Sequence, residues 1–311
     1  DPNNSLNGGT NANTNAAYLA ASGFVPPGAT VISYVVSSVT AVDDAAITPD
    51  KRPQIKFKFQ ESVNGAAPTD VIFQTYAAGT VTELMPNFVG SPSAYFAFAV
   101  PQDGIRNPAD FNVTGSGYIK TIWTQTAPTV GTMPMTRDAN GFYTLTLTNV
   151  RIPPNATMLT GGIGYTYSLS STIPLTQTNV NGFPYNPTTK QGGLIVPAHD
   201  AWKVATGYTG RRTVVDNNKC LTCHVSLGAD PQFHAGQRND APTCSFCHNP
   251  NRTSSGWSAN VKDFVHSIHG ARKRTVDFNW HAAQPGLTFG EVEFPGPLNN
   301  CQACHVAGGY D

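Results

Sequence analysis

The sequence predicts two parts: an all-β N-terminal domain, folded as an antiparallel sandwich or barrel, and a mostly irregular, slightly helical C-terminal domain. Three observations support this prediction. Short segments with alternating apolar and polar residues recur up to about residue 195. Beyond that point the alternation stops, and one short amphipathic helix is the clearest periodic pattern. All six cysteines of the 311-residue chain lie in this second part.

The predicted order along the chain is a tail, a β domain and a second domain. Residues 1–28 are polar and rich in Gly and Asn, which indicates a loosely ordered tail. We expect this tail to be a mature N-terminus left after removal of an export signal. Residues 29–195 form the predicted β domain and residues 196–311 the C-terminal domain. Two domains are the usual expectation for a chain of this length.

Seven short segments carry the strand pattern. Residues 54–59 alternate Ile and Phe with Lys, which predicts one buried and one solvated face. Residues 143–148 alternate Tyr and Leu with Thr just after an Asn-Gly turn signal. The other candidate strands are Val31–Val36, Val71–Tyr76, Ala94–Val100, Tyr118–Thr126 and Ile163–Leu169. Short strands separated by turn residues are typical of an antiparallel sandwich or barrel.

The composition excludes some classes of function. The formal net charge is +0 and 12% of residues are charged, against about 25% in typical soluble proteins. A chain without a basic excess lacks the attraction on which nucleic-acid binding depends, so we expect no nucleic-acid partner. No apolar run approaches the ~20 residues of a membrane-spanning helix, so we expect no transmembrane segment.

A five-residue pattern, C-x-x-C-H, occurs three times: as CLTCH from residue 220, CSFCH from residue 244 and CQACH from residue 301. It is the attachment pattern of c-type haem. The two cysteine sulfurs form thioethers with the haem vinyl groups, and the adjoining histidine binds the iron. The expected thioether residues are Cys220, Cys223, Cys244, Cys247, Cys301 and Cys304, and the expected iron ligands are His224, His248 and His305. We therefore predict three covalently attached haem c groups and a multihaem C-terminal domain.

Two other uses of paired cysteines fit less well. The gap between the first two pairs suits a zinc ribbon, but a zinc ribbon needs two pairs and would leave the third without a role. Zinc also does not require a histidine after each second cysteine. A thioredoxin-like redox pair needs a βαβ context, which this loop-rich segment lacks.

The second axial ligand of each haem decides the function. An open iron site can bind a small molecule, whereas two protein ligands leave an electron carrier. No methionine follows Met158, so methionine ligation is not expected. The histidines outside the motifs are His199, His234, His266, His269 and His281. They exceed the three vacant positions, so we expect histidine on both faces of every iron.

The five histidines are not equally good candidates. His266 and His269 lie on a helix predicted over Asn260–His269, which has apolar residues at i, i+3, i+4 and i+7 and Gly270 at its end. At this spacing the two histidines share a helix face with Cβ atoms about 5–6 Å apart. That is too close to flank one haem but suits the irons of two neighbouring haems.

The remaining three histidines have less support. His234 ranks first among them, because it lies between the first and second motifs. His281 is a further candidate, directly after a tryptophan. His199 is expected at the surface rather than on an iron.

Four stretches of the C-terminal domain together carry a resemblance. They are RRTVVDNNKCLTCH, FHAGQRNDAPTCSFCHNPNR, FVHSIHG and FPGPLNNCQACH. They resemble the OmcA/MtrC family of outer-membrane decahaem c-type cytochromes, specifically from about Thr206 to His305. The resemblance is looser over the β domain, where the family also places a strand-rich barrel before its first haem cluster. Family members continue through further haems, so we expect a fragment, a processed form or a short relative.

The resemblance implies electron transfer at or beyond the bacterial outer membrane, at the cell surface rather than in the periplasm. The implied acceptors are metal oxides, flavins and partner cytochromes. We also expect contact, haem edge to haem edge, with other multihaem cytochromes or identical chains. His234, His266 and His269 match ligand positions of the family. The protein is expected to be a carrier of electrons and not an enzyme.

Two other functions stay open at this point. A terminal reductase of a small oxyanion or metal ion would need one haem without a distal histidine. A subunit of a polymeric cytochrome filament would need identical chains that dock haem to haem. The sequence stops six residues after His305, so we expect the third haem to keep an exposed edge. That edge would face a haem in a partner chain or in a continuation of the polypeptide.

Overall fold

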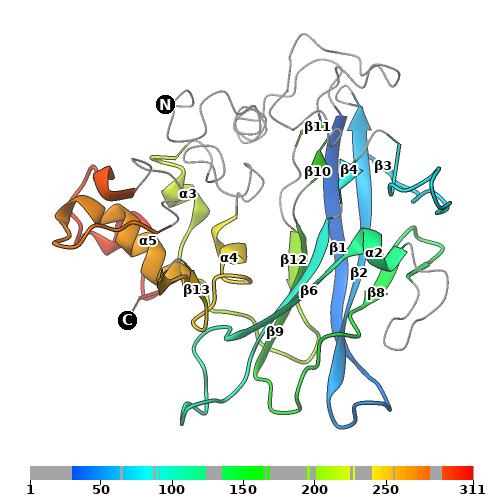
Figure 1. The fold of residues 1–311 in the computed structure, drawn as a ribbon, viewed down its shortest axis with the longest axis horizontal. Coiled ribbons are helices and arrows are strands. Elements are labelled where there is room, and N and C mark those ends of the chain that lie inside the picture. The colour runs from blue at the N-terminus through cyan, green and yellow to red at the C-terminus, as the bar shows by residue number, and fades with distance from the viewer. Residues whose placement is uncertain are drawn as a thin grey trace.

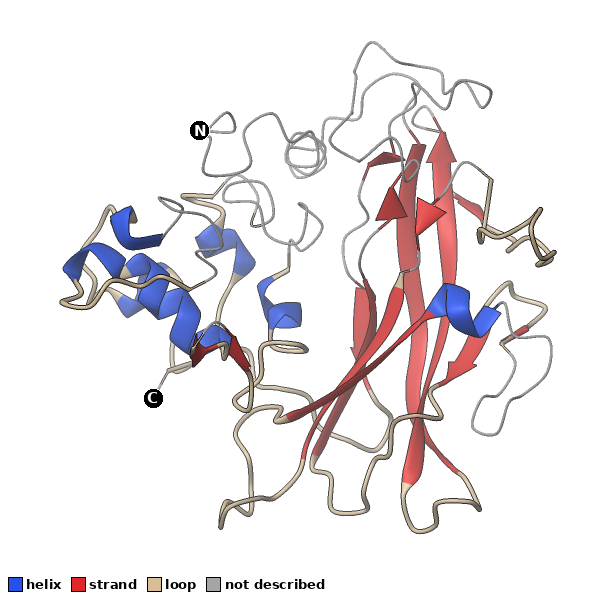
Figure 2. Cartoon of the chain, in the orientation of Figure 1, coloured by secondary structure: helices blue, strands red, loops and turns tan. Residues whose placement is uncertain are grey.

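The computed structural model describes residues 30–63, 66–86, 89–90, 92–123, 135–164, 167–168, 195–196, 201–224, 227, 240–254, 256–280 and 289–310. The strands form a tall β domain, and most of the short helices gather in a smaller part beside it (Figure 1). Figure 2 shows the same division by secondary structure. We call the smaller part, residues 205–310, the C-terminal segment. The predicted tail, residues 1–28, lies outside the described residues.

The larger sheet has six strands in the order β11-β1-β2-β8-β7, with β3 paired to β2. Their bounds are β1 Thr30–Asp43, β2 Lys51–Val63, β3 Thr69–Asp70, β7 Thr136–Arg137, β8 Tyr143–Thr146 and β11 Ile195–Val196. The pairs are antiparallel except for the short parallel pair of β1 with β11. The β1–β2 register runs from Thr30 opposite Val63 to Asp43 opposite Lys51, so these strands form one long hairpin.

A second sheet has four antiparallel strands in the order β12-β9-β5-β6. Their bounds are β5 Ser93–Ala99, β6 Val113–Tyr118, β9 Met158–Gly164 and β12 Ala201–Val204. Two short pairs stand apart, β4 (Val89–Gly90) with β10 (Tyr167–Ser168) and β13 (Thr253–Ser254) with β14 (Trp257–Ser258). The predicted antiparallel β architecture is confirmed. Strand β12 lies beyond residue 195, so the second sheet includes the chain that leads to the first cysteine motif.

The main hydrophobic core lies between the two sheets. Ile55, Phe57 and Phe59 of β2 are fully buried and join one cluster with Phe96 of β5 and Leu159 of β9. Burial of such large apolar side chains is the dominant favourable contribution to folding. The alternating pattern of β2 therefore identified the core face correctly.

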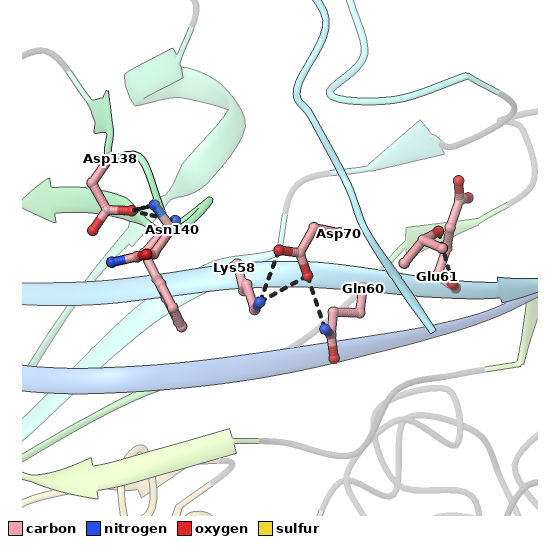
Figure 3. Close-up of polar contacts among 8 residues, drawn as sticks. Lys58, Gln60, Glu61, Asp70, Asp138 and Asn140 are labelled. Carbon is pink, nitrogen blue, oxygen red and sulfur yellow. Dashed lines mark hydrogen bonds and ion pairs between the residues drawn. The ribbon is translucent and has the colours of Figure 1, made fainter. Parts of the chain in front are cut away.

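The other face of β2 is polar, as its lysines predict (Figure 3). Lys58 and Gln60 both donate to the Asp70 carboxylate, each at 2.8 Å. The hydrogen bond from Lys58 is the largest cause that lowers the pKa of Asp70 below its ordinary value. Nearby, the Asp138 carboxylate accepts from the backbone N–H of Asn140 at 2.9 Å. This face of the β domain is thus held by hydrogen bonds and ion pairs rather than by burial.

The second sheet is covered on both faces. Ala94, Phe96 and Phe98 of β5 belong to the core between the sheets. Ala97, on the opposite face of the same strand, belongs to a separate cluster with Phe246 of the C-terminal segment. Both faces of a strand are buried only when packed structure lies on each side of the sheet. The C-terminal segment therefore packs against the outer face of the second sheet.

The C-terminal segment is built from short helical turns. They are α3 Asn217–Cys220, α4 Ala241–Cys244, α5 Val261–His269 and the 3-10 turns η4 Ala271–Lys273, η5 Phe289–Glu291 and η6 Cys301–Ala303. The predicted helix is confirmed as α5, with the Asn260 side chain accepting from the Lys262 N–H and Gly270 at its end. A small apolar cluster packs around it: Ala259, Phe264, Ile268, Ala271, Phe278 and Trp280.

Two predicted strands are wrong. The segment predicted as a strand over Tyr118–Thr126 leaves the sheet after Tyr118 and continues as helix α2, Ile119–Trp123. Its two buried isoleucines are three residues apart, which fits one face of a helix better than one face of a strand. Val71–Tyr76 forms no strand, and the N–H of Phe73 donates instead to the Tyr143 hydroxyl at 2.7 Å.

Candidate haem-binding sites

Each of the three cysteine motifs forms one helical turn. Cys220 ends α3, Cys244 ends α4 and Cys301 begins η6. In every motif the N–H of the histidine donates to the carbonyl of the first cysteine, at 2.9 Å in the first two motifs and 3.0 Å in the third. A turn of this kind brings residues i and i+3 to one side of the backbone. Both cysteines of a motif can therefore reach one edge of a porphyrin.

Capping residues start the turns of the first and second motifs. The Asp216 side chain accepts from the Asn218 N–H at the start of α3. Asp240 precedes α4, where Pro242 occupies the first turn. Both features are typical helix starts, because they satisfy or remove amide groups that have no partner inside the helix. The sequence next to these two motifs therefore favours the same local conformation.

The first and third motifs lie side by side, although they are far apart in the sequence. Val215 and His305 form an antiparallel bridge, and the Asp216 N–H donates to the Cys304 carbonyl at 3.1 Å. The Lys219 ammonium group donates to the backbone carbonyls of Gln302 at 2.9 Å and His305 at 2.6 Å. These hydrogen bonds join the start of one motif to the end of the other.

Helix α5 places its two histidines against two different motifs. The ring centroids of His269 and His224 are 6.1 Å apart, and those of His266 and His305 are 5.9 Å apart. Two imidazoles that bind one metal ion from opposite sides would be about 6 Å apart, since a metal–nitrogen bond is about 2 Å and a ring nitrogen lies about 1 Å from its ring centre. Both pairs have the spacing that a shared iron requires.

Hydrogen bonds orient the imidazoles of two candidate ligands, one on α5 and one in the second motif. Nδ1 of His269 is 2.9 Å from the Val265 carbonyl, and Nδ1 of His248 is 2.9 Å from the Ala259 carbonyl. Because a carbonyl oxygen only accepts, each Nδ1 must carry the proton, which leaves the Nε2 lone pair available for a metal. Nδ1 of His305 is buried and has no hydrogen-bond partner among the described residues.

The protonation of the site suits metal binding. Desolvation is the largest cause that lowers the pKa of His266, and the neighbouring His305 adds to it. A neutral imidazole is the form that binds iron. Desolvation also raises the pKa of the Cys220 and Cys304 thiols, and a charge on Cys223 would raise that of Cys304 further. These thiols stand where the thioether sulfurs would be.

The second motif faces aromatic side chains. The His248 ring lies 4.8 Å from that of Phe264 and 6.2 Å from that of Trp280. These two side chains belong to the cluster around α5 and form an apolar surface beside the histidine. His234 and His281, the remaining candidates for a second ligand, lie outside the described residues, as does His199.

The donor set fits haem c better than a bare metal ion. Six cysteines form three C-x-x-C pairs, each followed by a histidine. Within the described residues, no group of three or more His, Cys, Asp or Glu side chains could hold a metal ion, as a zinc ribbon would require. Each of the two imidazole pairs would instead suit the iron of one haem, whose remaining ligands would come from the porphyrin.

The comparison with protein families agrees with these motifs. Residues 212–311 match the family model described as outer membrane cytochrome MtrC/MtrF-like, domains II/IV. The resemblance to this group of cytochromes is thus confirmed over the C-terminal third of the chain, which holds all three motifs. No curated protein and no solved structure matches the chain. No helix in the described ranges is long and apolar enough to cross a membrane.

Proposed function

We propose, from the family match of residues 212–311, that this chain is an electron carrier with three covalently attached haem c groups. The matching domains are those of outer-membrane multihaem cytochromes, which typically carry electrons. The single observation that supports the finer proposal is the spacing of the α5 histidines. Each lies near the histidine of a different motif, with ring centroids 6.1 Å and 5.9 Å apart. This is about the distance between two imidazoles that bind one iron.

The proposed ligands follow from this spacing. His224 and His269 hold the first haem, and His305 and His266 hold the third. The second haem is attached through Cys244 and Cys247. Its ligands are His248 and either His234, which the family resemblance favours, or His281. Iron with histidine on both faces has no open position for a substrate, so the proposal favours a carrier over a terminal reductase.

Helix α5 gives the proposed carrier a direct electron path between the first and third haems. Two side chains at i and i+3 hold Cβ atoms about 5–6 Å apart, so the haems they bind must be neighbours. The hydrogen bonds between Asp216 and Cys304 and from Lys219 to His305 fix the same two motifs from the other side. We propose that electrons pass between the first and third haems without crossing the second.

The partners we propose are extracellular acceptors, such as metal oxides and flavins, and other haem groups, as the family resemblance implies. Apolar side chains exposed beside the third motif support contact with a further haem. Leu298 and Tyr310 are 53% and 41% exposed there. The further haem can belong to another multihaem cytochrome or to an identical chain. The proposed place of action is the outer membrane or the cell surface.

Mass and spectroscopy test the proposal. The intact mass should exceed that of the polypeptide by three haems, and the difference should survive acid denaturation because thioethers are covalent. The EPR spectrum should show three low-spin ferric haems and no high-spin signal. A mass increase of fewer than three haems, or a full high-spin haem that binds nitrite, would contradict the proposed ligands.

Substitutions on α5 test the ligand assignment. His269→Ala and His266→Ala should each convert one haem to high spin, and the double variant should convert two. Lys262→Ala is the matched control, because Lys262 is an exposed residue of the same helix and its loss removes a charge near His266 but no imidazole. If either histidine variant kept three low-spin haems, that histidine would not be a ligand.

A further inference from the structure

The second motif differs from the other two in one side chain. Phe246 occupies the second variable position of CSFCH and is 6% exposed. The corresponding residues are Thr222 in the first motif, which is exposed, and Ala303 in the third, which is half-buried. A haem motif needs only its cysteines and histidine for attachment, so a buried aromatic residue at this position calls for another explanation.

Phe246 packs into the β domain. Its ring lies 5.9 Å from that of Phe111 and 6.3 Å from that of Trp202 on β12, both edge to face at 81°. Ala97 of β5 completes the buried cluster. Edge-to-face aromatic pairs are worth about 0.5–1.5 kcal/mol each beyond the area they bury. We call Phe111, Trp202, Ala97 and Gly162 the Phe246 socket.

Gly162 of β9 allows this close approach. A Cβ atom added there would lie 3.2 Å from Cε2 of Phe246 and 2.7 Å from the Ala201 carbonyl oxygen. The latter distance is a clash with backbone, which cannot move aside easily. Glycine at this position therefore leaves the surface of the second sheet open for the phenyl ring.

Hydrogen bonds connect the two parts on the α4 side of the Phe246 socket. The Trp202 indole N–H donates to Asp240 at 3.1 Å, and the Asn217 amide donates to the same carboxylate at 2.6 Å. The Ala241 N–H donates to Asn217 at 2.9 Å. Asp240 precedes the helix that carries the second motif, so this contact holds the start of the motif.

A second set of hydrogen bonds follows the motif. The Asn251 amide donates to the Asn112 carbonyl at 2.9 Å, and the Arg252 guanidinium donates to the Thr114 hydroxyl at 3.1 Å. Both acceptors are residues of the β domain next to or within β6. The chain on each side of the second motif is thus bound to the second sheet, with Phe246 between the two points.

We propose that Phe246 is a positioning residue, which fixes the second haem relative to the β domain by occupying the Phe246 socket. This inference rests on the proposed attachment of haem at the second motif. The β domain then acts as a rigid support for that haem, whereas the first and third motifs are bound to each other. A cavity of about 70 Å³ lined by Phe246, Trp202 and Thr160 lies beside the ring. Truncation of Phe246 would join its space to this pocket, whose lining includes the polar Thr160 and Arg211, and would give water a route behind the motif.

The experiment compares variants of the haem-loaded protein on both sides of the contact. They are Phe246→Ala and Phe246→Leu in the motif, Trp202→Ala on β12, and the double variant Phe246→Ala with Trp202→Ala. Val204→Ala is the matched control, because Val204 lies on the same strand and is 40% exposed, as Trp202 is. Haem number is measured by mass, and each haem is followed by its EPR signal and by redox titration of the visible spectrum.

We expect three haems in every variant and a change confined to one haem. Phe246→Ala should shift the EPR signal and lower the potential of that haem, because water reaching a haem favours the charged ferric state. Trp202→Ala should shift the same signal, and the double variant should shift it less than the sum of the two single changes. Phe246→Leu should lie near the wild type, and Val204→Ala should equal it.

Other outcomes separate this inference from the proposed function. Three haems with unshifted signals in Phe246→Ala, or additive shifts in the double variant, would overturn the positioning role and leave the proposed function intact. Fewer than three haems in the wild type would overturn the proposed function itself. If Phe246→Ala fails to fold, Trp202→Ala decides, because it alters the same contact from the β-domain side and should still shift the signal of one haem. Loss of stability with no change in the signal of any haem would show a structural role only.

Discussion

The β domain and the C-terminal segment are each stabilised internally in a different way. In the β domain, two sheets share a continuous core in which aromatic rings pack on one another, as Phe59 does on Phe73 at 5.1 Å. In the C-terminal segment, a small cluster surrounds the nine-residue helix α5, and the cysteine motifs are single turns joined by loops. The first region can bury enough apolar surface by itself, whereas the second would depend on the volume of the proposed haems.

The two regions also use their polar side chains differently. On β2, the lysines pair with carboxylates that face solvent, as Lys58 does with Asp70. In the C-terminal segment, imidazoles are brought together in pairs, and partial desolvation lowers the pKa of one of them, His266. The β domain therefore uses polar contacts for its surface, and the C-terminal segment uses them for its proposed chemistry.

Removal of the proposed haems should have the largest effect and should act on the C-terminal segment alone. In a variant with all six motif cysteines replaced by alanine, we expect the C-terminal segment to unfold and the β domain to stay folded. The reason is that the small cluster around α5 cannot offset the entropy of ordering that segment. Hydrogen exchange measures this difference between the two regions. The amides of β1, β2 and β5 should stay protected, and those of α5 should exchange freely. Persistent protection of α5 would show that the segment folds without haem.

A core substitution should affect the β domain alone. Phe57→Ala removes a fully buried ring, and such changes cost about 3–5 kcal/mol. Urea unfolding followed by far-UV circular dichroism should show this loss, while the haem spectrum of the folded protein stays unchanged. Ile72→Ala, at a residue that is 66% exposed, is the control and should change stability by less than about 0.5 kcal/mol. Equal losses for both would mean that the core assignment is wrong.

A single hydroxyl group should have a smaller effect. Tyr143→Phe keeps the ring stacked on Phe73 at 4.2 Å but removes the acceptor of the buried Phe73 N–H. An unsatisfied buried N–H costs about 1–3 kcal/mol. Thermal unfolding should show this loss for Tyr143→Phe and none for Tyr118→Phe, at a tyrosine that is 57% exposed. No difference between the two variants would mean that water replaces the hydroxyl.

The smallest expected effect is the acid sensitivity of the polar face. The pKa of Asp70 is lowered, chiefly by its hydrogen bond from Lys58. The contribution of Asp70 to the free energy of unfolding is therefore complete above the ordinary carboxyl pKa of 3.8. It is lost as the pH falls through the lower pKa of the folded state. Asp70→Asn should lower urea stability at pH 7 and flatten the acid side of the stability profile. Asp43→Asn, at a carboxylate with a side chain 90% exposed, should leave the profile unchanged.

Features that depend on local pattern could be predicted from the amino-acid sequence. The alternation in β2 identified its buried face, and the spacing of apolar residues identified α5 and its Asn260 cap. The three C-x-x-C-H motifs, being contiguous, also indicated the cofactor without knowledge of the fold. Each of these signals is contained within a few residues, because strands and helices repeat over two and 3.6 residues.

Contacts between residues far apart in the sequence became visible in the folded chain. It placed His269 against His224 and His266 against His305, a pairing that no local pattern could assign. It also placed Phe246 of the second motif in the β domain, where the sequence had shown no role for it. Such contacts depend on how the elements pack across the whole chain, and packing is a property of complementary surfaces rather than of periodicity. The turn to α2 after Tyr118 has the same cause, since two buried isoleucines fill the core better from a helix.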